Sequence, residues 1–303
     1  MIQKIARKCR HERDSGISPV RSCFIALVVV CLTVAFSFEE KHETLSQKLD
    51  ALGKIHGSFT FAVIGETRSG GEDYLELVHA VMEHKPDFVV NTGDMVVSPN
   101  KARWSEFWEQ SKEITVPYFL TVGNHDVRDK KSEALYKEEV DLPGNELYYS
   151  FAVDDSLFIF LDSNMPGQDR KITGDQYKWV EQTLAGSDQK YKFVFVHHPL
   201  YPEKGLGHHY GGSLDKYPKE RDRLESLFVK YGVNIVFVGH EHLYLRKTVD
   251  GILHIITGGG GASLYAGVEK GGFYHFILVK VDETNVTGKV IDIRDKVKDT
   301  FER

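Results

Sequence analysis

Residue types that can bind metal ions recur in five short motifs along this chain. The motifs read GETR, NTGD, GNHD, HHP and GHEH, at residues 65–68, 91–94, 123–126, 197–199 and 239–242. Their carboxylate, amide and imidazole groups suit borderline or hard cations such as manganese, iron, zinc or cobalt. Thiolate ligands are excluded, because all three cysteines lie before residue 40. The residue types therefore predict a metal centre that uses no cysteine.

Each motif follows a short run rich in β-branched and aromatic residues, which is typical of a buried strand. We predict strands at residues 58–65, 87–91, 117–122, 157–161, 192–196 and 234–238, and helices at 74–84, 102–114, 175–184 and 219–231. This alternation indicates an α/β fold. Because ligands bind beyond the carboxyl ends of the strands in open α/β sheets, we expect the five motifs to converge.

The remaining strand-like segments indicate that the sheets are mixed. Residues 146–153 run through Asp154 and Asp155 into the next strand, as in a hairpin. Three more strands are predicted after residue 242, and Asp250-Gly251 is a turn signal between the first two. The glycine-rich residues 257–263 lack the lysine of a phosphate-binding loop, so we expect a tight turn passing the metal crevice.

The order of the motifs resembles that of the calcineurin-like metallophosphoesterases. Members of this family usually carry D-x-H, GD, GNH[DE], H-x-P and GHxH, and this chain has all but the first intact between residues 65 and 242. The resemblance implies a four-layer α/β/β/α sandwich, in which two mixed β-sheets are flanked by helices. It assigns residues 46–303 to a metallophosphoesterase domain with a dinuclear site at one edge.

The resemblance also implies which residues hold the two metal ions. Asp94 would bridge them, and the other ligands would be Asn124, His197 and His240 at one ion and Glu66 and His242 at the other. His125 would donate a proton to the leaving oxygen, and Asp126 would orient it. A metal-activated water would then hydrolyse a phosphomonoester or phosphodiester without a protein nucleophile.

The first motif departs from the family pattern, because Glu66 and Arg68 replace the usual aspartate and histidine. Glutamate still ligates a cation, but a protonated guanidinium has no free lone pair. We therefore expect one of the two metal sites to be weakened. Arg68 would instead bind the substrate phosphate, replacing metal charge with fixed charge.

Several nearby residues receive a separate interpretation. Val97 stands where purple acid phosphatases carry a tyrosine, three residues after the bridging aspartate, which favours a non-purple member. We expect His198 to lie outside the ligand set and Glu241 to be solvated. Residues 207–210 would form either a loop that selects the substrate or a mobile exposed loop.

Residues 1–45 are predicted to be a targeting segment. Basic residues precede the apolar stretch 23–38, and a polar linker follows over residues 39–48. A cleaved signal and a retained membrane anchor both fit. Either places the domain outside the cytoplasm, in the periplasm or secreted, or anchored to the membrane.

Composition narrows the remaining choices. A hydrophobic fraction of 41% with 27% charged residues is ordinary for a globular chain, which excludes wholesale disorder. The net charge of −6, without a basic stripe, argues against dedicated nucleic-acid binding. A small-molecule or lipid phosphate ester is the expected substrate. The alternatives are a degenerate, non-catalytic domain that binds metal and phosphate, and an envelope phosphoesterase acting on lipid-linked substrates.

Overall fold

The structure is a computed structural model that describes residues 43–303, which form one compact unit. The predicted signal or anchor therefore lies outside the described residues, apart from its last three positions. Within the described part, no helix combines the length and apolar character needed to cross a membrane.

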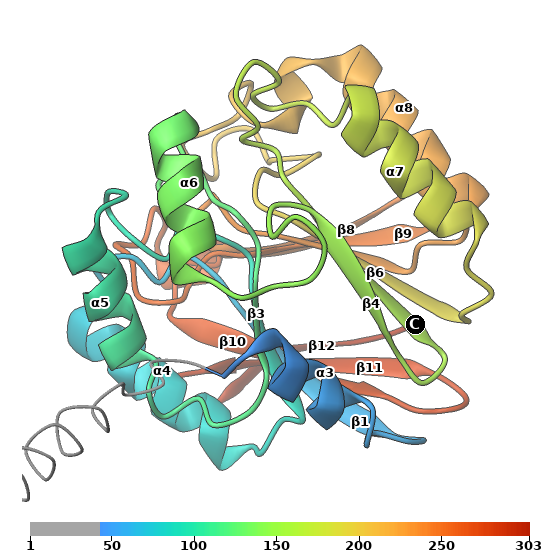
Figure 1. The fold of residues 1–303 in the computed structure, drawn as a ribbon. Coiled ribbons are helices and arrows are strands. Elements are labelled where there is room, and N and C mark those ends of the chain that lie inside the picture. The colour runs from blue at the N-terminus through green and yellow to red at the C-terminus, as the bar shows by residue number, and fades with distance from the viewer. Residues whose placement is uncertain (1–42) are drawn as a thin grey trace, which may run out of the picture. The chain divides into compact units, whose positions relative to one another are not determined.

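Two six-stranded sheets form the centre of the molecule (Figure 1). The first has the order β12-β11-β10-β1-β2-β3, built from Val297–Glu302, Val286–Asp292, His275–Val281, Phe59–Ile64, Phe88–Asn91 and Tyr118–Leu120. The second has the order β4-β5-β6-β7-β9-β8, built from Tyr149–Val153, Ser156–Leu161, Tyr191–Val196, Ile235–Val238, Ile252–Thr257 and Tyr244–Val249. Both sheets contain parallel and antiparallel pairs, so the prediction of mixed sheets is confirmed.

The sheets face each other across a core rich in phenylalanine. The ring of Phe61 on β1 lies 5.2 Å from that of Phe158 on β5 and 5.3 Å from that of Phe193 on β6, in edge-to-face contacts. Successive strand residues point to opposite faces. Ile159 therefore lies on the outer side of the second sheet, in a separate apolar cluster with residues of the helices that cover it.

Helices cover the outer faces of both sheets. α7 (Gly174–Ala185) and α8 (Pro218–Lys230) pack on the second sheet through buried residues such as Val180 and Phe228. α4 (Gly71–Glu83) and α5 (Lys101–Gln110) bury residues such as Leu77 and Trp104 with the first sheet. The predicted four-layer α/β/β/α sandwich is thus confirmed (Figure 1).

Four elements were not predicted from the sequence. α3 (Leu45–Leu52) begins inside the predicted polar linker, where Thr44 and Gln47 form a capping box. α6 (Lys130–Glu139) begins with a similar box at Asp129 and buries few residues, so its apolar periodicity is weak. In β11, buried residues alternate with less buried ones, and the edge strand β12 exposes most of its residues. Neither strand therefore has a continuous apolar run. Two short 3₁₀ helices, η2 (Leu214–Lys216) and η3 (Val268–Lys270), lie in the loops.

The buried His275 at the start of β10 predicts a pH-dependent stability. Its Nδ1 lies 2.8 Å from the carbonyl oxygen of Phe273, and its Nε2 lies 3.2 Å from the Thr257 hydroxyl. Burial lowers the pKa of this imidazole from 6.5 to about 4. Between pH 6.5 and pH 4 the unfolded chain therefore protonates this histidine, whereas the folded chain does not. The free energy of unfolding falls over this range as the pH drops, by up to about 3 kcal/mol.

Replacing His275 with Gln should reduce this pH dependence of the free energy of unfolding, measured by urea denaturation between pH 4 and 7. The exposed His56 provides the matched control, and His56→Gln should leave the dependence unchanged. Equal slopes for His275→Gln and the parent chain would contradict the assignment.

Candidate metal centre

After three of the strands, one residue adopts a left-handed backbone conformation and directs the chain toward a common point. Glu66 follows β1, Asp94 follows β2 and His240 follows β7, with φ angles of 60°, 61° and 67°. Such left-handed conformations cost on the order of 1 kcal/mol each for residues other than glycine, and they concentrate at functional sites. The strain marks these turns as positions fixed by a requirement of the site.

The first predicted ligand group does converge. His197 Nε2 lies 3.1 Å from Asn124 Oδ1, 3.2 Å from His240 Nδ1 and 3.5 Å from Asp94 Oδ1. His197 Nδ1 lies 3.0 Å from the carbonyl oxygen of Thr92 and donates to it, which leaves the lone pair of Nε2 facing the other three groups. Buried lone pairs aimed at one point require a positive charge between them. These four residues therefore fit a metal ion.

The second predicted ligand group surrounds an arginine. Glu66 Oε2 lies 3.0 Å from His242 Nε2, and the Arg68 Nε atom lies 3.5 Å from Glu66 Oε2 and 3.3 Å from Asp94 Oδ2. Arg68 Nη2 is 3.2 Å from His242 Nε2. Glu66, Asp94 and His242 are thus brought together as expected, with the guanidinium among them.

The two carboxylates of this centre lie out of contact with solvent. Burial, reinforced by the charge of Asp94, raises the pKa of Glu66 to about 8. Burial acts in the same direction on Asp94, but the neighbouring His197 and His125 outweigh it and lower the Asp94 pKa. The charged form of this pair therefore depends on the cations around it.

Asp126 plays a different part from the one predicted. Its two carboxylate oxygens accept hydrogen bonds from the backbone N–H groups of Gly123, Asp94, Met95 and Val96, at 2.9 to 3.1 Å. It thereby fixes the turn that carries Asp94. The expectation that Asp126 orients His125 is wrong, because its oxygens are engaged by these backbone groups.

The carbonyl oxygen of Val97 holds the His125 ring instead. It lies 2.8 Å from His125 Nδ1, and it also accepts a hydrogen bond of 2.9 Å from Arg128 Nη2. His125 Nε2 consequently faces the centre, 3.9 Å from Asp94 Oδ2, and the side chain is 26% exposed. This geometry leaves Nε2 accessible to a bound ligand.

Glu241 is buried, not solvated as expected, with only 2% of its surface exposed. Its two oxygens accept 2.8 Å hydrogen bonds from the backbone N–H groups of His208 and His209. A side chain at Gly207 would collide with the same carboxylate, since its Cβ would lie 1.8 Å from Glu241 Oε2. Of the two alternatives for residues 207–210, a loop held in place fits these contacts better than a mobile one.

The anchored loop places imidazole rings over the metal centre. The ring of His209 contacts that of His240, with 4.0 Å between the ring centres and a tilt of 35°, and the ring of His208 stacks on that of Tyr265 at 4.1 Å. Tyr265 in turn stacks on His242 at 3.9 Å and 9°. Sequence reasoning did not assign these rings to the site; the signal available was two adjacent histidines in the glycine-rich segment after the HHP motif.

His198 lies closer to the centre than predicted. Its ring nitrogen and those of His197 and His240 fall within 4.8 Å of one another, a grouping that could hold an ion. His198 Nδ1 is 2.9 Å from the Ser163 hydroxyl. Burial, and then the neighbouring His197, hold the pKa of His198 well below its usual range, so the ring is neutral.

The glycine-rich segment 257–263 packs against the first and last motifs. Gly260 N and Ala262 N donate to the carbonyl oxygens of Gly65 and Glu66, at 2.8 and 2.9 Å. A Cβ on Gly260 would lie 2.3 Å from the Gly65 oxygen, so only glycine allows this approach. The carbonyl oxygen of Ser263 accepts a hydrogen bond of 2.6 Å from His242 Nδ1. This agrees with the expected tight turn beside the metal crevice.

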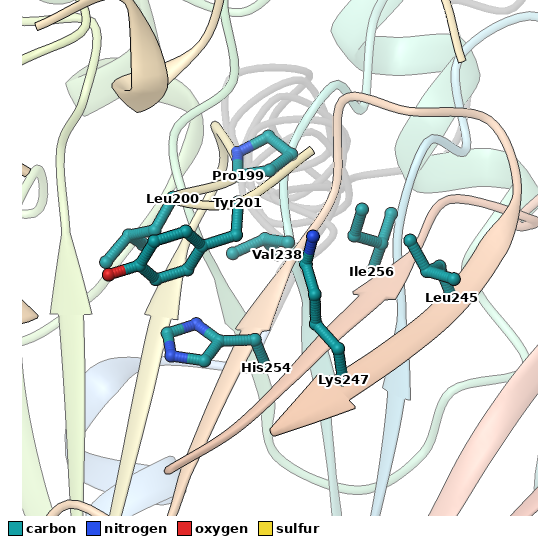
Figure 2. Close-up of a pocket in the computed structure, with 8 residues that line it drawn as sticks. All are labelled: Pro199, Leu200, Tyr201, Val238, Leu245, Lys247, His254 and Ile256. Carbon is teal, nitrogen blue, oxygen red and sulfur yellow. The ribbon is translucent and has the colours of Figure 1, made fainter. Parts of the chain in front are cut away.

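Two pockets differ in their capacity for a substrate. One, of about 660 Å³, opens beside Asn124 and is lined by Arg128, Lys130, Asn164 and Arg170 among others. The other, shown in Figure 2, lies around Tyr201, Lys247 and His254, and its volume of about 10 Å³ is that of roughly one water molecule. Of these two, the pocket beside the metal centre has room for a phosphate ester.

Removing the Glu241 carboxylate should free the loop that it anchors. In Glu241→Ala, two hydrogen bonds to a charged group are lost, on the order of 2 kcal/mol, so tryptic cleavage after the exposed Lys204 should accelerate roughly tenfold or more. Glu269 is an exposed carboxylate outside this loop, and Glu269→Ala, in which cleavage should keep the parent rate, provides the control. Cleavage at the parent rate in Glu241→Ala would show that the loop is held by other contacts.

Comparison with known proteins agrees with this geometry. Residues 59–244 match the family model described as calcineurin-like phosphoesterase. The chain is 29% identical over 254 residues to phosphoenolpyruvate phosphatase from Allium cepa, covering 72% of this chain and 50% of that protein. It is 26% identical over 223 residues to the human serine/threonine-protein phosphatase CPPED1, covering 66% and 70%. It is also 27% identical over 221 residues to a probable inactive purple acid phosphatase 24 of Arabidopsis thaliana, covering 59% and 35%.

Solved structures share the fold. The purple acid phosphatase PPD1 from yellow lupin seeds superposes with a TM-score of 0.68 at 20% identity, over 81% of this chain and 53% of its own. GAP50, the anchor in the inner membrane complex of Plasmodium, superposes with a TM-score of 0.63 at 15% identity, over 82% of this chain and 89% of its own. The chain spans about a third to a half of the two plant relatives aligned by sequence. Because the family match extends over residues 59–244, more than half of its length, the chain belongs to the calcineurin-like phosphoesterase family.

Proposed function

We propose that this chain hydrolyses phosphomonoesters or phosphodiesters at the metal centre. The observation that carries the proposal is the convergence of Asp94, Asn124, His197 and His240 on one point, next to a histidine held by its Nδ1. A cation held there would neutralise phosphate oxygens and activate a water molecule. Membership of the family, with its phosphatase relatives, supports hydrolase chemistry.

His125 is the proposed proton donor to the leaving oxygen. The Val97 carbonyl engages its Nδ1, so Nε2 is the nitrogen available to an ester bound beside Asp94. A proton delivered from Nε2 would neutralise the alkoxide that forms as the P–O bond breaks. The Val97 carbonyl holds the ring through Nδ1, and the bond from His125 N to Asp94 Oδ1 (2.8 Å) holds the main chain that carries it.

The basic pocket beside Asn124 is the proposed site for the rest of the substrate. Arg128, Lys130 and Arg170 line it; Arg170 Nη1 pairs with Asp169, and its Nε has no hydrogen-bond partner within residues 43–303. Guanidinium donors favour planar anions such as carboxylate or phosphate. A domain outside the cytoplasm or anchored to a membrane would meet soluble and lipid-linked esters.

Arg68 supports a rival, non-catalytic function. It replaces the family's usual histidine, and a domain with this change could bind metal and phosphate without hydrolysis. Incubation with an aryl phosphate, an aryl phosphodiester and a phospholipid in micelles, each with added manganese, zinc or magnesium, separates the two. Hydrolysis that a chelator abolishes supports the proposal, activity confined to micelles identifies a lipid-linked substrate, and metal binding without any hydrolysis supports the rival.

His125→Ala should lower kcat by roughly 10²- to 10⁴-fold, the usual contribution of a general acid. Metal content, measured by elemental analysis of the purified chain, should stay at the parent value, because His125 lies outside the converging ligand group. Replacement of the exposed His56 by Ala is the control and should change neither quantity. Full turnover in His125→Ala would remove this residue from the mechanism.

A further inference from the structure

We propose that the Arg68 guanidinium is itself the second cation of this centre, so that the chain binds one metal ion where its relatives are built for two. The inference deepens the proposed function and rests on the metal centre described above. Arg68 contacts all three residues predicted to hold the second ion, Glu66, Asp94 and His242, and its guanidinium lies among the atoms that would bind that ion.

The two carboxylates divide their oxygens between the two positions. Glu66 Oε1 and Asp94 Oδ1 lie 3.8 and 3.5 Å from His197 Nε2, facing the first ligand group. Glu66 Oε2 and Asp94 Oδ2 lie 3.5 and 3.3 Å from Arg68 Nε. One oxygen of each residue therefore serves the metal, and the other is matched by the guanidinium.

The lone pair of His242 is also taken by the arginine. His242 Nδ1 donates to the Ser263 carbonyl at 2.6 Å, so Nε2 is the acceptor that would bind an ion. That atom lies 3.0 Å from Glu66 Oε2 and 3.2 Å from Arg68 Nη2, and with Nδ1 protonated it accepts from the guanidinium, which also pairs with Glu66. An imidazole in this state has no further electron pair in its plane for a metal.

The position of the arginine is fixed by the main chain. Arg68 N donates to the Asp94 carbonyl at 3.0 Å, and Glu66 N donates to the Gly93 carbonyl at 3.1 Å. The first motif is thus tied to the second, and the guanidinium cannot leave without breaking contacts with buried groups. Its charge is permanent and, unlike that of an ion, is not lost by dissociation.

The same side chain retains a route to the substrate. Arg68 is 18% exposed, whereas Glu66 beneath it is fully buried. A guanidinium has five donors in one plane, and among residues 43–303 only Nη2 makes a side-chain hydrogen bond, whereas Nε lies at ion-pair distance from the two carboxylates without one. The remaining edge is available to a phosphate oxygen, which is the substrate role expected from the sequence.

The test counts ions. The full chain, saturated with manganese and passed through a desalting column, should contain one ion per chain by elemental analysis. Arg68→His and the double variant Glu66→Asp/Arg68→His restore the family's usual residues and should contain two. Arg294 is an exposed arginine far along the sequence, and Arg294→Ala is the control expected to keep one.

Electron paramagnetic resonance gives a second readout that does not depend on activity. One manganese ion gives a six-line spectrum, whereas two ions roughly 3.5 to 4 Å apart are exchange-coupled and lose it. Circular dichroism establishes that each variant is folded, and Arg68→Lys, which keeps the charge, should keep one ion.

The outcomes separate this inference from the proposed function. Two ions in the parent chain, or one ion in the folded Arg68→His variants, would overturn the role of Arg68 and leave metal-dependent hydrolysis intact. No bound ion in the parent chain would instead overturn the proposed function. One ion in the parent and two in the variants supports both.

Discussion

Two carboxylates buried at neighbouring strand ends are the constraint on which this site depends. Glu66 is fully buried and Asp94 is 1% exposed, and each reaches the centre from a strained turn. Buried negative charges are expensive unless cations or hydrogen-bond donors surround them. The Arg68 guanidinium and the N–H donors of the turns meet that requirement in part, and the lone pairs around His197 add to the need for a cation.

The sandwich supplies the rigidity that holds these groups in place. Phenylalanine rings from both sheets pack against one another in the space between the sheets. Interiors packed in this way have low compressibility. Asp126 then joins the loops after β2 and β3 through four backbone N–H groups. Gly260 lets a third segment approach the first motif closely. Side chains far apart in sequence therefore meet with fixed geometry.

A loop held by Glu241 lies beside this rigid centre. Glu241 binds the backbone of His208 and His209, the His208 ring stacks on Tyr265, and the His209 ring contacts His240 at a tilt. These contacts lie beside the residues that would hold metal, so they shape access to it. The pocket near Asn124, lined by Arg128, Lys130 and Arg170, opens beside the same centre.

The sequence by itself determined the α/β class and the five strands that end in motifs, because buried strands leave local patterns, and the order of the motifs, through the family resemblance, supplied the four-layer architecture and the candidates for the ligand set. It missed α3, α6, β11 and β12, whose exposed residues obscure such patterns. Only the tertiary structure decided that the Asp126 carboxylate binds backbone N–H groups and that Glu241 is buried. It also decided that the Arg68 guanidinium lies among the side chains of Glu66, Asp94 and His242. The reason is physical: a side chain's partners come from strands distant in sequence, and its role depends on which of those partners its atoms reach.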